Sequence, residues 1–481
     1  MPTNTTLRFF LLLFFLSSAA AALSPSHIQR RNLVRRHLQS LSSFFPSPSP
    51  SPSPSLSPSP SPSSSPLPIY STSSTSHIFH ATDFGADPTG STDSTAALSH
   101  ALSAASSSSH FSLMPSIPNF GGAELHLDGG NYLISSPIFL PSSGAGNLKI
   151  HSGSLLASNI FPPDRYLIEL NGSTSSAFSF EYITLAGLML DSNFRGGGIA
   201  VVDSLRVIID GCYIVHFTTD GVLIRNGHEN LIRNCYIGQH ITAGSDPGER
   251  KFTGTAVQLN GNDNAVTDVV IFSAAVGILV AGEANIITGV HCYNKAAAFG
   301  GTGIYVKLPG LTQTRIVNCY LDFTGIVVED PVQLLISGSF FLGDANVAFK
   351  SVNGVIKDVN VVDNLFSGRN RGAHNVWLDE SSGKFETVDQ VVVNRNAVMG
   401  MLPRSTVARG TVEGNGTMWT VDFSAVLLFP NRIDQVQYSL VTTNGFPGHT
   451  LRSVESNRVV IVSDIVVNAT VHVEVGQAVG P

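Results

Sequence analysis

The sequence contains little charge, and outside its first residues it lacks long hydrophobic runs. Charged residues make up 13% of the 481 residues, and the formal net charge is −7. No basic run accompanies an aromatic motif, so nucleic acid is disfavoured as a partner. After the N-terminal segment, no stretch approaches the ~20 uninterrupted apolar residues that cross a bilayer. We therefore expect no membrane span in the mature chain.

Cysteine is also scarce, and each of the 4 cysteines is followed by a tyrosine in a short repeating phrase. The phrases are centred on Cys212, Cys235, Cys292 and Cys319. They recur at intervals of roughly 20 to 30 residues, or about twice that, which is typical of a solenoid. The longest interval leaves room for one further unit, in which Ile271 takes the place of cysteine.

The spacing of these cysteines matches no metal-binding motif, and no arrangement of histidine and asparagine marks one of them as a nucleophile. We therefore expect no metal and no cofactor. Cys212 with Cys235, and Cys292 with Cys319, are predicted to lie on adjacent coils, within the ~4.4–6.8 Å Cα separation of a disulfide. Two disulfides and a ladder of buried free thiols are both compatible with this pattern.

The N-terminal residues predict export from the cell. Residues 1–22 contain one arginine, an apolar run and then small residues, which is the pattern of a cleaved signal peptide. Residues 23–76 form a Ser/Pro-rich linker, in which frequent proline prevents sheet pairing and favours polyproline II. Three N-glycosylation sequons fit passage through the secretory pathway. They lie at Asn171, Asn415 and Asn468.

A six-residue phrase repeats through the middle of the chain and predicts stacked strands. Its copies begin at Gly198, Gly221, Ala256, Gly277, Gly303, Gly325 and Asn346. The second and fourth residues of every copy are apolar, which is the period-2 pattern of a strand with one buried face. Stacking of successive units about 4.8 Å apart gives an all-β fold, a right-handed parallel β-helix.

Two further regions complete the expected domain organisation. The run that follows Ser94 predicts a short helix, which would cover the open end of the solenoid. This cap and the repeats make a β-helix catalytic domain of residues 77–400. Residues 401–481 lose the repeat but keep strand-like runs, so they are predicted to form a small β-rich C-terminal module. The protein is expected to be a monomer.

The fifth position of the phrase faces outwards and forms a predicted outer column. Its members are Val202, Arg225, Asn260, Ala281, Lys307, Glu329 and Lys350. Cations stacked along a groove can bind an acidic ligand. The candidate substrate-binding residues are therefore Arg225, Asn260, Lys307 and Lys350. A ladder of ion pairs on the surface is the alternative interpretation.

Carboxylates near this column are candidates for acid–base chemistry. Hydrolysis of a glycosidic bond needs two of them, ~5–5.5 Å apart for retention or ~6.5–9.5 Å apart for inversion. Glu329, Asp330 and Asp344 are predicted to form one such cluster. The lysines that flank Glu329 favour its charged form, which suits a base.

A second group of chemically active residues lies earlier in the chain. Its members are Asp220, His228, Glu229, His240 and Asp263. An insertion that carries Asp246 and Glu249 could overhang the groove. An Asp-Gly pair before a strand is more often a turn than an active site, which weakens the case for Asp220 taken alone.

Longer stretches of the chain resemble the pectin-lyase-like superfamily. HATDFGADPTGSTDSTAAL at residues 80–98 is similar to the opening signature of plant polygalacturonases. Residues 319–345 and 361–368 resemble polygalacturonases of the Quartet-three type, which are related to glycoside hydrolase family 28. The resemblance implies hydrolysis of demethylated homogalacturonan, the pectin of the plant cell wall, by inversion and without a cofactor.

The catalytic motifs of family 28 carry over only in part. Its N-T-D motif matches Thr218-Thr219-Asp220, which keeps the acid, and its R-I-K motif matches Tyr305-Val306-Lys307, which keeps only the lysine. Its G-D-D motif falls near Gly238-Gln239-His240, without either carboxylate, and Gly227-His228-Glu229 is a poor substitute for G-H-G. The predicted catalytic residues are therefore Asp220, Glu329, Asp330 and Asp344.

The sequence thus predicts a secreted polygalacturonase that hydrolyses the α-1,4-galacturonosyl bonds of demethylated pectin. Two alternatives stay open. A pectate lyase would use a basic residue and usually calcium, for which the sequence shows no clear carboxylate cage. A non-catalytic pectin-binding protein of the cell wall would explain the missing G-D-D motif.

Overall fold

The computed structural model describes residues 77–107, 111–172, 178–240, 253–293, 301–443 and 445–477. The predicted signal peptide at 1–22 and the predicted linker at 23–76 lie outside the described residues. Ser74–Pro481 form one compact unit. Among the described residues, no helix is long and apolar enough to cross a membrane.

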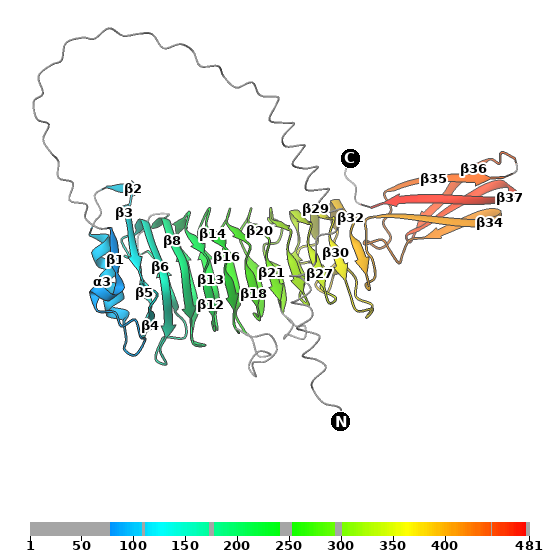
Figure 1. The fold of residues 1–481 in the computed structure, drawn as a ribbon. Helices are drawn as coiled ribbons and strands as arrows, with labels where there is room; N and C mark the ends of the chain where they lie inside the picture. Colours follow the sequence, from blue (N-terminus) through cyan, green and yellow to red (C-terminus); the bar gives the residue numbers. More distant parts are fainter. Residues whose placement is uncertain are drawn as a thin grey trace, which may run out of the picture. The chain divides into compact units, whose positions relative to one another are not determined.

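Parallel strands stack coil upon coil and form three faces (Figure 1). Two faces, the first and second stacks, belong to one 23-stranded sheet. The long strands β6 (Ala145–Ala157) and β8 (Phe180–Asp191) take part in both stacks. The third face is a separate 10-stranded sheet, called the third sheet below. This arrangement confirms the predicted parallel β-helix.

The remaining strands divide among the three faces. The first stack contains β1 (Ile78–His80), β3 (Ile117–His126), β10 (Ser204–Leu205), β11 (Ile208–Asp210), β14 (Leu231–Arg233), β17 (Ala265–Thr267), β20 (Ile286–Thr288), β23 (Arg315–Val317), β26 (Val332–Ser337), β29 (Val355–Val362) and β32 (Thr387–Asn394). The second stack contains β4 (Asn131–Ile134), β12 (Tyr213–Val215), β15 (Tyr236–Gly238), β18 (Val270–Phe272), β21 (His291–Tyr293), β24 (Tyr320–Asp322), β27 (Phe340–Leu342), β30 (Leu365–Ser367) and β33 (Ala397–Met399). The third sheet contains β5 (Ile138–Phe139), β7 (Tyr166–Leu170), β9 (Gly197–Val202), β13 (Asp220–Arg225), β16 (Thr255–Asn260), β19 (Val276–Val280), β22 (Thr302–Val306), β25 (Ile326–Glu329), β28 (Val347–Lys350) and β31 (Val376–Asp379).

The apolar positions of the repeating phrase build the inner side of the third sheet. Val222 pairs with Ile199 on one neighbouring strand and with Val257 on the other. The same register continues strand by strand as far as Phe349. These paired side chains are fully buried. Because side chains alternate between the two faces of a strand, the third and fifth positions of the phrase face outwards.

The predicted N-terminal helix is present as α3 (Thr95–Ser106), and a 3-10 turn, η2 (Ala81–Phe84), precedes it. The helix begins directly after Ser94, as expected. Its apolar side, with Leu98 and Leu102, joins the hydrophobic core of the coils. The short strand β2 (Ser112–Met114) pairs antiparallel with β3. The N-terminal coil is therefore closed by packed apolar side chains rather than left open to solvent.

Asparagine side chains fill the corner at which the chain leaves the third sheet for the first stack. Asn230, Asn264 and Asn285 are buried there. Asn264 Oδ1 accepts a hydrogen bond from Asn230 Nδ2 at 3.0 Å, and Asn264 Nδ2 donates to Asn285 Oδ1 at 3.2 Å. Gly261 and Gly282 stack at the same corner, where a Cβ on Gly282 would lie only 2.1 Å from the Gly261 carbonyl oxygen. The corner therefore tolerates no side chain at these glycines.

The cysteines do not all share one column of the coil. Cys212 donates its backbone N–H to Cys235 Sγ at 3.4 Å, so these two lie on adjacent coils as predicted. Cys292 pairs in register with Ile271, but Cys319 lies two residues before the strand partner of Cys292 on the next coil. Cys292 and Cys319 thus also lie on adjacent coils as predicted, but they are displaced by two residues and are not in register. All four thiols are free and buried, and burial raises the pKa of Cys292 to about 12.

The C-terminal module is a four-stranded antiparallel sheet. Its strands are β34 (Val407–Asp422), β35 (Gln435–Thr442), β36 (His449–Glu455) and β37 (Arg458–Gly476), and β37 pairs with each of the others. Trp419, Phe423 and Ile461 belong to a core of its own. The change from parallel to antiparallel pairing falls between β33 and β34.

Candidate functional site

The outer side of the third sheet carries the predicted outer column, and the predicted register is confirmed. Arg225 pairs with Asn260, and Glu329 pairs with Lys350. Lys307 directly follows β22, the strand that neighbours the strand of Glu329. Each coil adds one residue to the column, about 4.8 Å from the previous one. The predicted substrate-binding residues therefore lie in one line on the protein surface.

Glu329 is a buried carboxylate within this column, with 5% of the residue exposed. Its Oε1 accepts hydrogen bonds from Tyr305 Oη at 2.5 Å and from Lys350 Nζ at 3.0 Å. Burial by itself raises the pKa of Glu329. The hydrogen bonds from Tyr305 and Lys350, with the positive charges of Lys350 and Lys307, outweigh burial and lower the pKa below its ordinary value. Glu329 is therefore charged at neutral pH and suited to accept a proton.

The last strand of the sheet places another carboxylate and an aromatic ring beside this pair. On β31, Asp379 pairs with Lys350, and Trp377 lies on the same side of the strand two residues earlier. Trp377 is 39% exposed and lines a cavity of about 700 Å³. Arg404 and Arg458 also line this cavity. The downstream end of the outer column thus combines an exposed indole, two carboxylates and several cations.

The predicted cluster of Glu329, Asp330 and Asp344 is not formed. Asp330 is fully buried, and its carboxylate accepts three backbone N–H groups from the turn after β28. Asp344 accepts hydrogen bonds from the backbone N–H and the Nε of Arg369, at 2.7 and 2.8 Å. It precedes β28, whose length of about 10 Å separates it from Lys350. The prediction was wrong because it used the coil number and ignored the position along the strand.

Asp220 lies at the start of β13, at the opposite end of this strand from Arg225. Tyr166 Oη donates a hydrogen bond to Asp220 Oδ2 at 2.6 Å. Burial raises the pKa of Asp220, and hydrogen bonds from Tyr166 and Thr255 offset only part of that rise. A raised pKa suits a proton donor. However, four strand spacings, about 19 Å, separate this strand from that of Glu329, so the two carboxyl groups cannot serve one bond.

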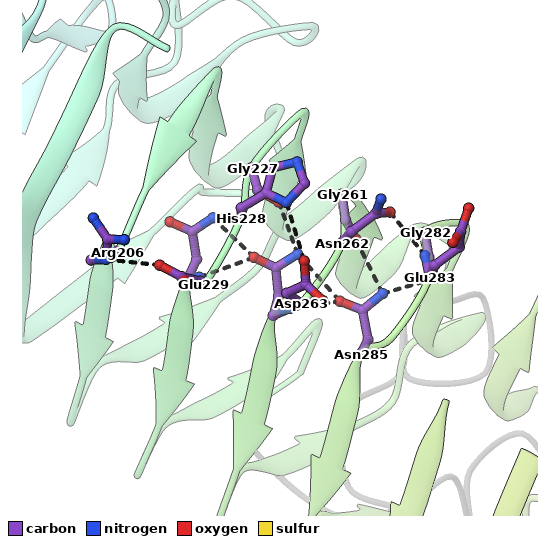
Figure 2. Close-up of polar contacts among 12 residues, drawn as sticks. Arg206, Gly227, His228, Glu229, Gly261, Asn262, Asp263, Gly282, Glu283 and Asn285 are labelled. Atoms are coloured by element: carbon purple, nitrogen blue, oxygen red, sulfur yellow. Dashed lines mark hydrogen bonds and ion pairs between the residues drawn. The ribbon is translucent and has the colours of Figure 1, made fainter. Parts of the chain in front are cut away.

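A smaller cavity of about 380 Å³ lies at the C-terminal ends of β9, β13 and β16. Its lining includes Asp203, His228 and Asn260. His228 Nδ1 lies 3.3 Å from Asp263 Oδ2 (Figure 2). Glu229, the residue after His228, forms an ion pair with Arg206. Polar side chains of this cavity therefore lie next to the N-terminal half of the outer column, which includes Asn260.

The second predicted group is divided by the fold. His228 lines the smaller cavity, with Asp263 beside its ring and Glu229 next to it in the chain. Asp220 lies at the other end of β13. His240 is 3% exposed, and its ring centroid lies 5.5 Å from that of Phe194. The insertion that contains Asp246 and Glu249 falls outside the described residues.

Four side chains on this face were missed by the sequence interpretation. They are Tyr166, Tyr305, Trp377 and Asp379. The segment at 375–380 continues the apolar alternation by one more coil, so a longer alignment would have found Asp379 and Trp377. Tyr305 occupies an outward position of an aligned copy of the phrase. Its hydrogen-bond partner Glu329 was already among the predicted catalytic residues. Tyr166 precedes the aligned repeats, so only the coil register reveals its contact with Asp220.

The asparagine of each sequon is exposed. Asn171 directly follows β7 and is exposed. Asn415 and Asn468 are both exposed and pair directly across β34 and β37. Glycosylation at these residues stays a prediction.

The fold and the charged face define the class of protein. The chain is a parallel β-helix protein of the pectin-lyase-like superfamily. Over 407 residues it is 58% identical to Polygalacturonase QRT3 of Arabidopsis thaliana, an alignment that covers 84% of this chain and 85% of that protein. The chain therefore belongs to the Quartet-three type of plant polygalacturonases.

Similar solved structures share much less sequence with the chain. Endo-xylogalacturonan hydrolase from Aspergillus tubingensis is 12% identical with a TM-score of 0.47, over 67% of this chain and 92% of that chain. PfbA, a surface adhesin of Streptococcus pneumoniae, is 14% identical with a TM-score of 0.46, over 70% of this chain and 90% of that chain. No family model matches the chain.

Proposed function

We propose that the protein is a secreted polygalacturonase that hydrolyses the α-1,4-galacturonosyl bonds of demethylated pectin in the plant cell wall. The identity of 58% to Polygalacturonase QRT3 supports this assignment. The structural observation that carries it is Glu329, a carboxylate held by Tyr305 and Lys350 on the outer side of the third sheet. Secretion is proposed from the predicted signal peptide and the sequons.

The outer column suits an acidic polysaccharide. Arg225, Lys307 and Lys350 supply positive charge along a line of strands. Galacturonic acid carries a carboxylate on each sugar residue, so a demethylated chain presents a row of negative charges to these side chains. The exposed ring of Trp377 offers a flat apolar surface for a sugar ring. Because methyl esterification removes the negative charges, demethylated pectin is the preferred substrate.

Hydrolysis would use Glu329 as the base and Asp379 as the acid. Their strands are two spacings apart, about 9.6 Å, close to the ~6.5–9.5 Å between the carboxyl groups of inverting glycosidases. Glu329 removes a proton from water, whose oxygen forms a bond to C1 of one galacturonosyl unit. The bond from C1 to the glycosidic oxygen breaks, and this oxygen takes the proton of Asp379. The new reducing end has the inverted configuration.

The assignment is tested by release of reducing ends from polygalacturonate. Glu329→Gln and Asp379→Asn should each lower the rate by roughly 10²–10⁴-fold, the usual contribution of a general acid or base. Asp344→Asn is the matched control and should keep the wild-type rate, because Asp344 lies outside the column. A wild-type rate for Glu329→Gln would contradict the proposal. A wild-type rate for Asp379→Asn would exclude Asp379 as the acid.

Non-catalytic pectin binding is the second candidate function. It is favoured by the observation that three of the predicted catalytic residues, Asp220, Asp330 and Asp344, do not converge with Glu329. A binding protein immobilised on a chromatography resin would retain polygalacturonate without shortening the polymer. A pectate lyase would instead release unsaturated products and stop when calcium is chelated. Product analysis with and without a chelator separates the three functions.

A further inference from the structure

A cluster of histidines lies on the first stack, on strands of the N-terminal coils. The register of β1, β3 and β6 brings His80, His126 and His151 into one row across three neighbouring strands. Asp128 follows β3, and its Oδ1 lies 2.6 Å from His80 Nδ1 and 2.8 Å from His126 Nδ1. Two imidazole rings thus converge on one carboxylate oxygen.

The contacts of this cluster are short and converge on one carboxylate. His126 Nδ1 lies 2.8 Å from Asp128 Oδ1, and the backbone N–H of Asp128 lies 3.0 Å from the same nitrogen. His80 Nδ1 lies 2.6 Å from the same carboxylate oxygen. Two imidazole nitrogens and one carboxylate therefore form a compact donor set, which a divalent cation would bind in place of the protons that link these groups.

We propose that His80, His126 and Asp128 bind one divalent transition-metal ion of the zinc type. Each residue offers a ligand atom, and these atoms lie within 4.8 Å of one another. Zinc binds histidine nitrogen at about 2.0–2.1 Å and carboxylate oxygen at about 2.0–2.2 Å, and a site with three protein ligands keeps a position for water. Two imidazoles disfavour calcium and magnesium, which prefer oxygen ligands.

The surroundings of the cluster fit a metal site. The side chain of His80 is 46% exposed and that of Asp128 is 24% exposed, so an ion and its water can reach them from solvent. Thr82 Oγ1 donates to Asp128 Oδ2 at 3.2 Å and orients the carboxylate. The ring of His151 packs edge-on against His126, with 4.7 Å between the ring centroids. Such neighbours hold the ligands in place and raise the affinity of a site.

An ion at this position would stabilise the N-terminal coil. It would link β1 to the segment after β3, two parts of the chain more than 40 residues apart, and so reinforce the parallel pairing of β1 with β3. The site lies on the first stack, whereas the proposed catalytic residues lie on the third sheet. Its occupancy therefore does not depend on the proposed function.

Calorimetric titration of the purified full chain with zinc tests this proposal, after removal of bound metal with a chelator and without a histidine tag. One equivalent of zinc should bind to the wild type. Asp128→Asn and His126→Ala should weaken zinc binding on the order of 100-fold or more. Loss of a residue that only hydrogen-bonds to a metal ligand already weakens binding about 10- to 100-fold. His100→Ala, which removes an exposed histidine of α3, is the matched control and should bind as the wild type does.

Thermal unfolding gives the second readout. Zinc should raise the melting temperature of the wild type and of His100→Ala, and leave Asp128→Asn and His126→Ala unchanged. Melting of the metal-free variants at the wild-type temperature shows that they are folded. The proposal is overturned if zinc binds the wild type no more tightly than Asp128→Asn, or if calcium displaces zinc at equal concentration.

Discussion

At the residue scale, the surroundings set opposite protonation tendencies for two carboxyl groups of the same sheet. Exposed Asp and Glu have pKa values near 4. Glu329 lies between a tyrosine and lysines, which stabilise its charged form and lower its pKa despite burial. Asp220 receives hydrogen bonds from the neutral hydroxyl groups of Tyr166 and Thr255, so burial dominates and raises its pKa. The opposite directions of the two pKa shifts therefore come from the neighbouring side chains.

Tyr305→Phe should raise the pKa of Glu329, because the variant loses the 2.5 Å hydrogen bond to Oε1. In the wild type this pKa lies below the ordinary value, so the carboxylate is present above it and is lost as the pH falls through it. A higher pKa moves the acidic limb of the pH–rate profile to higher pH. Initial rates on polygalacturonate between about pH 3 and 7 measure this shift.

Tyr213→Phe is the control for this experiment. Tyr213 stacks on Tyr236 in the second stack, with 4.5 Å between the ring centroids, and does not contact the outer column. Its profile should match the wild type. An acidic limb that stays in place in Tyr305→Phe would argue against Glu329 as the base.

At the scale of the elements, the short strands depend on their corners. Strands of three residues are frequent in the first and second stacks, and such strands have few backbone hydrogen bonds of their own. Asn264 accepts the backbone N–H of Asn230 at 3.1 Å and donates to the Gly227 carbonyl oxygen at 3.1 Å. The amides of the ladder thus satisfy buried backbone groups where the chain turns from one face to the next.

Asn264→Ala should lower the free energy of unfolding by about 2–4 kcal/mol, because it leaves several buried polar groups without a partner. Urea unfolding followed by fluorescence measures this loss. Asn360→Ala, on an exposed position of β29, is the control and should change stability by no more than about 0.5 kcal/mol. Equal stability of the two variants would show that the ladder contributes little.

At the scale of the whole molecule, the distribution of charge matters more than its sum. The net charge is −7, yet the outer column presents Arg225, Lys307 and Lys350 on one side of the third sheet. Salt screens such exposed charges over about 10 Å at 0.1 M and about 3 Å at 1 M. An acidic polysaccharide should therefore bind to a negatively charged protein through a local positive surface, and bind more weakly as salt increases.

Lys307→Ala should weaken binding of polygalacturonate roughly two- to fivefold at low salt, the effect of one exposed ion pair. The difference from the wild type should vanish near 1 M salt, where screening is complete over a few ångströms. Affinity electrophoresis at increasing salt measures both effects. Lys357→Ala, on the first stack, is the control. Identical salt dependence in Lys307→Ala and the wild type would contradict binding along the outer column.

Local patterns in the sequence are sufficient to predict the coils of the β-helix and the composition of the outer column. The alternation of apolar residues is a local property, and a solenoid converts it into contacts between successive copies. For this reason the pairing of Arg225 with Asn260 and of Glu329 with Lys350 could be predicted. The cap helix after Ser94 and the C-terminal strands were likewise visible in local patterns.

Contacts between side chains away from the aligned strands could not be predicted without the three-dimensional fold. Asp330 turns into the core and binds backbone N–H groups, and Asp344 lies at the far end of β28, because turns between faces follow no repeating pattern. The displacement of Cys292 by two residues has the same cause. His80 and Asp128 show the rule most clearly, since stacking of the first coils joins residues that no spacing in the sequence connects.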